Sequence, residues 1–127
     1  LETYGALLRL LSDLPRLDRS RALALAETAT GKQGAERFEL ILTLLETFLS
    51  RLARAGALGQ TPPEATGGEA ALIARLAPTP AAALAWADVG HDLAARARRG
   101  KAVNLDPAAL LMDILLQIDE TARQLVP

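Results

Sequence analysis

The chain has 127 residues, enough for one domain with its own hydrophobic core. Half of the residues are hydrophobic but only 3% are aromatic, so the core must consist mainly of Leu, Ala, Ile and Val, and this composition favours helices. The 14 basic and 15 acidic residues leave a net charge of −1, which gives no global electrostatic case for nucleic-acid binding. The lack of cysteine excludes disulfides and thiolate zinc sites and fits a reducing cytoplasm.

The first thirty residues predict two helices. Residues 2–13 place four large side chains on one helical face: Tyr4, Leu7, Leu8 and Leu11. Pro15 is expected to stop this helix, because proline lacks an amide hydrogen and restricts the residue before it. Asp18 is a suitable N-cap for a second helix over residues 18–30, with Gly31 in the C′ position.

Residues 36–55 give the strongest helical pattern in the chain, and we expect this helix to be the most buried. Its hydrophobic residues recur at helical spacing over more than four turns: Phe38, Ile41, Leu42, Leu45, Phe48, Leu49 and Leu52. Gly56 is predicted to end the helix. Residues 57–68 are rich in small and turn-forming residues and predict a surface loop.

The second half of the chain predicts three more helices. A short one covers residues 69–76 and breaks at Pro78, and Pro80 lies in the first turn of the next, which Gly100 should end. The inward face of that helix is expected to contain Ala82, Trp86, Val89, Leu93 and Ala97. Asp106 followed by Pro107 is a typical helix start, with a hydrophobic staple between Leu105 and Leu110. This last helix should run to Val126 with six residues inward: Leu111, Ile114, Leu115, Ile118, Ala122 and Leu125.

Together these elements predict an all-α fold, a compact bundle of five to six helices that forms a single domain over residues 1–127. No stretch reaches the roughly 18 apolar residues that a membrane span needs, so we expect a soluble, cytoplasmic protein. The chain begins at Leu1 and its one methionine is Met112, which suggests that it is part of a longer protein.

The patterns that could carry chemistry have simpler structural explanations. Gly31 and Lys32 follow a helix rather than a strand, so they predict a helix end and not a phosphate loop. Asp88, His91 and Asp92 share a helical face, but one histidine without further ligands predicts a solvent-exposed face with no metal, where Asp92 pairs with Arg96. We therefore expect no catalytic residues, no metal and no cofactor.

Two features indicate binding instead. A basic cluster of Arg96, Arg98, Arg99 and Lys101 complements the dipole at a helix C-terminus, with phosphate contact as the alternative interpretation. Four hydrophobic residues depart from the inward faces of their helices: Leu40, Leu44, Met112 and Leu116. They predict a subunit interface, unless neighbouring helices of the same bundle cover them.

The stretch from Ala102 to Pro107, sequence AVNLDP, followed by LLMDIL over residues 110–115, resembles the last helix of bacterial clamp-loader subunits. The LPRLDR segment at residues 14–19, an Ala/Leu helix and the 36–55 helix resemble the matching region of delta-prime subunits of DNA polymerase III. The resemblance implies a non-catalytic collar domain that follows an ATPase-like module and packs against the collar domains of other subunits during sliding-clamp loading in DNA replication.

The resemblance also implies that the isolated chain is monomeric or weakly self-associating, with other clamp-loader subunits as partners. The near-neutral charge and the short basic cluster lead us to expect no DNA contact. An alternative is the ligand-binding and dimerisation domain of a helical transcription regulator, which predicts a symmetric dimer with an internal apolar pocket. A small helical enzyme would require converging polar groups, and the sequence does not predict them.

Overall fold

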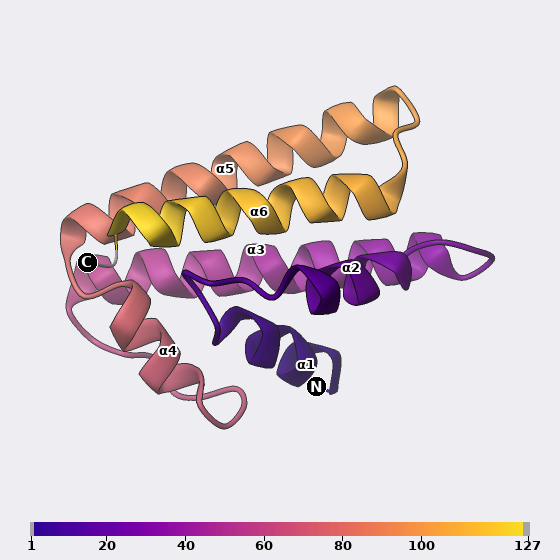
Figure 1. The fold of residues 1–127 in the computed structure, drawn as a ribbon. Coiled ribbons are helices and arrows are strands. Elements are labelled where there is room, and N and C mark those ends of the chain that lie inside the picture. The colour runs from indigo at the N-terminus through magenta and orange to yellow at the C-terminus, as the bar shows by residue number, and fades with distance from the viewer. Residues whose placement is uncertain (1, 126–127) are drawn as a thin grey trace.

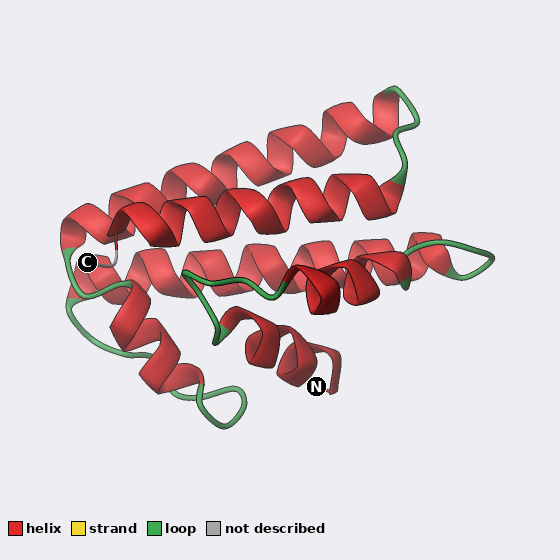
Figure 2. Cartoon of the chain, viewed as in Figure 1, coloured by secondary structure: helices red, strands yellow, loops and turns green. Residues whose placement is uncertain are grey.

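The computed structural model describes residues 2–125, and within that range all regular structure is helical (Figures 1 and 2). This confirms the predicted all-α fold. The six helices are α1 (Glu2–Leu11), α2 (Arg19–Glu27), α3 (Gly34–Leu58), α4 (Glu69–Leu76), α5 (Pro80–Ala102) and α6 (Pro107–Leu125). No single helix among the described residues has the length and hydrophobicity of a membrane span.

Helix α3 is the centre of the bundle and contacts α1, α4, α5 and α6, while α2 packs against α6. Figure 1 shows α3, α5 and α6 extended side by side, with α5 antiparallel to both of its neighbours. The short helices α1 and α4 lie on one side of α3, and the turn between α5 and α6 is at one end of the molecule (Figure 1).

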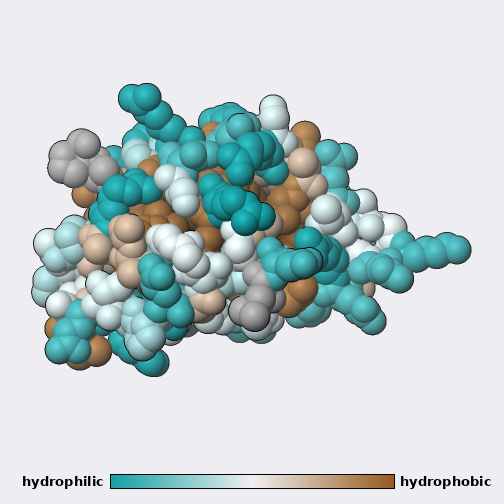
Figure 3. Space-filling view, turned by 90° about the horizontal axis from the view of Figure 1, so that it is seen from below, coloured by the Kyte–Doolittle hydropathy of each residue, from teal (hydrophilic) through white to brown (hydrophobic). Residues whose placement is uncertain are grey.

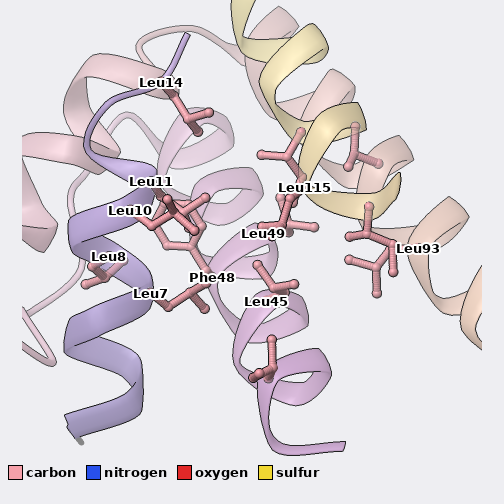
Figure 4. Packing of buried hydrophobic residues seen from close by; sticks show 14 of the residues in the cluster. Leu7, Leu8, Leu10, Leu11, Leu14, Leu45, Phe48, Leu49, Leu93 and Leu115 are labelled. Atoms are coloured by element: carbon pink, nitrogen blue, oxygen red, sulfur yellow. The ribbon is translucent and has the colours of Figure 1, made fainter. Parts of the chain in front are cut away.

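The core is formed by the helical faces that the spacing of hydrophobic residues predicted. Every inward residue predicted for the 36–55 helix is buried, as are those predicted for α1 and α5. Figure 4 shows Leu7 and Leu11 of α1 close to Phe48 of α3, and Leu115 of α6 near Leu49 of α3. Because these side chains come from helices far apart in the sequence, their packing fixes the helices relative to one another.

The predicted helix starts are confirmed at three positions. The Asp18 side chain accepts a hydrogen bond from the amide of Arg21 at 3.1 Å and caps α2. Pro80 begins α5 and Pro107 begins α6, as expected for proline in a first turn. Thr79 adds a cap that we did not predict, since its hydroxyl accepts from the amide of Ala82 at 3.1 Å.

The prediction that Gly56 and Gly100 end their helices is wrong. Helix α3 continues through Gly56 to Leu58 and is closed by Gly59, whose φ of 68° is left-handed. Helix α5 continues through Gly100 to Ala102. Both glycines are buried where another part of the bundle comes close, so they serve packing instead of chain termination.

Three other helix limits differ from the prediction. Helix α1 ends at Leu11 rather than at residue 13, and α2 ends at Glu27, so that Gly31 lies in the following turn and not at C′. After α2, the Thr28 and Thr30 hydroxyls donate to the carbonyls of residues 25 and 27 at 2.6 and 2.7 Å. The third helix spans residues 34–58 in place of 36–55, and the predicted end of α6 at Val126 lies outside the described residues.

Candidate subunit interface

The four residues predicted to form a subunit interface differ in accessibility. Leu40 on α3 is 43% exposed. Leu44 on the same helix, and Met112 and Leu116 on α6, are only partly exposed and pack against the hydrophobic core. The structure therefore leaves Leu40 accessible to solvent, whereas the other three already contribute to the packing of the bundle.

Several hydrophobic side chains that we did not predict as interface residues are exposed. Among the described residues these are Leu23, Leu58, Leu84, Val103 and Leu105. Figure 3 shows one face of the molecule, in which hydrophobic patches lie between hydrophilic side chains. Val103 and Leu105 belong to one short turn between α5 and α6, so these two exposed side chains are closer together in the sequence than any others of this group. The sequence signal that could have found them is two aliphatic residues between a helix end and the next N-cap.

Two members of the basic cluster are engaged in ion pairs. Arg96 pairs with Asp113 of α6 at 3.2 Å and with Asp92 at 3.9 Å, which confirms the predicted Asp92–Arg96 pair. Lys101 pairs with Glu39 of α3. Arg98 and Arg99 are exposed, and no ion pair joins them to a carboxylate within residues 2–125.

The other patterns considered for chemistry lie on the surface. Asp88, His91 and Asp92 are exposed, and the residues described contain no cluster of acidic or histidine side chains that could hold a metal. Gly31 has a φ of 86° in the turn after α2, and Lys32 is exposed.

A buried charge that the sequence did not predict occurs at the start of α4. The Glu69 side chain is inaccessible to solvent, and its two oxygens accept from the Arg51 guanidinium of α3 at 2.8 and 2.9 Å. The amide of Ala65 also donates to Glu69 at 2.8 Å, and the Tyr4 hydroxyl of α1 donates to it as well. One carboxylate thus joins α1, α3, α4 and the loop before α4.

The protonation of this group is set by the same contacts. Burial by itself would raise the pKa of Glu69, but the hydrogen bonds from Ala65, Tyr4 and Arg51 and the charge of Arg51 outweigh it and hold the pKa below its usual range. Burial and the bond to Glu69 raise the pKa of the Tyr4 hydroxyl. Glu69 is therefore ionised and Tyr4 neutral near pH 7.

A second buried carboxylate joins the beginning and the end of the chain. Asp119 of α6 is 4% exposed and accepts from the amide of Leu17 at 3.0 Å and from Arg123 at 2.5 Å. In a similar way, Arg75 of α4 donates to the carbonyls of Ser12 and Leu14 at 2.9 and 2.5 Å. These bonds hold the segment between α1 and α2 in place, because they satisfy backbone groups that a helix would otherwise satisfy.

Comparison with known proteins gives no match to a family model, to a curated protein or to a solved structure. Function is therefore inferred from the residues and from their geometry.

Proposed function

We propose that this chain is the C-terminal collar domain of a clamp-loader subunit resembling delta-prime of bacterial DNA polymerase III. In this role it is a non-catalytic oligomerisation domain in the cytoplasm, and it packs against the collar domains of other subunits in the assembly that loads the sliding clamp during DNA replication. The observation that supports it most is the Asn-Leu-Asp-Pro turn at residues 104–107, which joins two long antiparallel helices and leads into the leucine-rich α6.

The distribution of polar groups is in line with a packing role. The two buried carboxylates, Glu69 and Asp119, are engaged in hydrogen bonds that link helices to loops. Their partners are arginines, backbone amides and the Tyr4 hydroxyl of the same chain. ATP hydrolysis in such an assembly would belong to an ATPase-like module outside this chain. We therefore assign none of the family's catalytic residues to a position in this chain.

Leu40 is the first residue that we assign to the subunit contact. Burying a leucine side chain is worth up to about 1.5–3 kcal/mol, and the exposed 43% of Leu40 is the part that a partner can still cover. Leu44, Met112 and Leu116 have less surface left to contribute, since they pack against the core. Ring contacts are head-to-tail, so the opposite side of the domain must present a different surface to a second neighbour.

The test is to change Leu40 to Glu in the full-length parent and to measure its co-purification with the other clamp-loader subunits. We expect assembly to fall while the helical circular dichroism signal is unchanged. Leu58→Glu is the matched control, because Leu58 lies on the same helix, is 66% exposed and is not assigned to the contact. If the Leu40→Glu variant assembles as well as the wild type, the assignment of Leu40 to the subunit interface is wrong.

Leu44→Glu and Leu116→Glu answer a second question. Both side chains pack against the core, so we expect these variants to lose stability as well as assembly. Sedimentation of the wild-type chain tests the transcription-regulator alternative, because a stable symmetric dimer would favour that function over a collar domain, which we expect to be monomeric or weakly self-associating.

A further inference from the structure

The turn between α5 and α6 displays hydrophobic side chains on an ordered backbone. Val103 is 66% exposed and Leu105 is 54% exposed. The backbone of the turn is held by hydrogen bonds from the amides of residues 103, 104 and 105 to the carbonyls of residues 99, 101 and 100, at 3.1, 3.2 and 2.9 Å. Asn104 occupies the left-handed region with a φ of 57°, which suits asparagine better than most residues. The two aliphatic side chains are therefore preorganised.

Leu105 lies between two hollows. One has a volume of about 300 Å³ and includes Phe38 and Pro107 in its lining, and the other has a volume of about 450 Å³ and includes Val103 and Arg99. Gly100, Leu105 and Leu110 line both, so the hollows adjoin each other on either side of Leu105. Leu105, which the sequence predicted to pack against Leu110, is half exposed. We name the residues that line these two hollows the α5–α6 turn surface.

Not every cation at this surface is paired with a carboxylate. Arg96 and Lys101 are paired with carboxylates of this chain, whereas Arg99 has no such pair among residues 2–125. The dipole of α5 favours cations at its C-terminus, which explains why arginines occur there. It does not explain the two exposed aliphatic residues that follow them. Apolar side chains grouped with an arginine are a composition found in protein interfaces.

We propose that the α5–α6 turn surface binds an acidic amphipathic segment of another protein. Its aliphatic side chains enter the two hollows that Leu105 lines, and a carboxylate of the segment pairs with Arg99. Nucleic acid fits less well, because the surface has carboxylates at its border, Glu39 and Asp113, and no exposed aromatic side chain on which a base could stack. The surface contains none of the four residues of the proposed collar contact, so this inference does not depend on the proposed function.

The experiment selects ligands without assuming their sequence. A phage library of random peptides is panned on the wild-type chain, and the enriched peptides are labelled and titrated by fluorescence anisotropy. We expect them to combine Leu or Ile with Asp or Glu. Leu105→Ser and Arg99→Glu should each weaken binding about tenfold or more. Added salt should weaken it too, since Arg99 is exposed.

Leu84→Ser is the matched control, because Leu84 is 70% exposed near the other end of α5, and it should bind as the wild type does. Leu40→Glu should also keep peptide binding, which separates this inference from the collar contact. Circular dichroism checks that each variant is folded. If Leu105→Ser unfolds, the location of the site is tested in the wild-type chain by the amide chemical-shift changes that the peptides cause. We expect these changes to be concentrated in residues 96–113.

Four results would overturn the proposal. These are the absence of enriched peptides, enrichment of neutral or basic peptides, equal binding by the wild type and both surface variants, and tighter binding of single-stranded oligothymidylate than of the peptides at the same residues.

Discussion

The contact between α3 and α5 at Gly56 can be tested with a single methyl group. A Cβ added at Gly56 would lie 2.8 Å from the Cβ of Ala83 and 2.8 Å from the carbonyl oxygen of Thr79. These atoms are fixed to the backbone of α5 and its N-cap and cannot rotate away. Gly56→Ala must therefore either compress this contact or push the two helices apart.

The expected magnitude is a balance of two opposing effects. Alanine in the interior of a helix is more favourable than glycine by about 1 kcal/mol. Overpacking of a core typically costs about 1–3 kcal/mol, and more when backbone atoms are the obstacle. We expect Gly56→Ala to lower the free energy of unfolding by about 1–2 kcal/mol in total.

Gly90 on α5 provides the matched control. A Cβ there would meet only the Cβ of Leu49, at 3.7 Å, which is an ordinary van der Waals distance. Gly90→Ala should therefore raise the free energy of unfolding by about 0.5–1 kcal/mol. Urea titrations followed by far-ultraviolet circular dichroism measure both variants. If Gly56→Ala is as stable as Gly90→Ala, the close approach of α3 and α5 described here is wrong.

Three further predictions concern the core, the buried carboxylate and ligands. Leu45→Ala should cost about 2–5 kcal/mol in the same titrations, because Leu45 is fully buried on the central helix, and a loss well below 1 kcal/mol would place α3 at the periphery. The ionised Glu69 contributes stability above its unfolded-state pKa of about 4.3, and this contribution is lost as the pH falls through its lower folded-state pKa; the wild type should thus lose more stability than Glu69→Gln on acidification, and parallel curves would refute the assignment. Isothermal calorimetry should detect no tight binding of ATP or zinc, and micromolar ATP affinity would contradict a packing role.

The hydrophobic periodicity was sufficient to identify the helices and their inward faces. A helix buries one face, so residues such as Phe48 and Trp86, at the right spacing, could be assigned to the core without knowledge of their neighbours. The helix starts at Asp18, Pro80 and Pro107 were equally local, because a cap or a first-turn proline acts on the amides of its own turn.

The candidate site was predicted only in part. Leu40 was correctly predicted to lie outside the core. Leu44, one turn further along the same helix, packs against the core instead. Both leucines lie away from the main hydrophobic face of the helix. Whether such a residue is exposed or covered depends on where the neighbouring helices lie. The exposed turn residues Val103 and Leu105 were not predicted as a binding surface, because their environment includes α3, which precedes them by more than forty positions.

What tertiary structure alone decided is the role of residues whose local sequence allows two outcomes. Gly56 and Gly100 have the usual features of helix ends, yet both lie inside helices, where α5 comes close to Gly56 and the Leu110 side chain comes close to Gly100. Glu69 would be a solvated first-turn carboxylate by its position in α4, but Arg51 and Tyr4 reach it from other helices and allow it to be buried with its charge. Local sequence determines how a segment folds, whereas the desolvation and satisfaction of each polar group depend on partners that only the assembled bundle brings within contact.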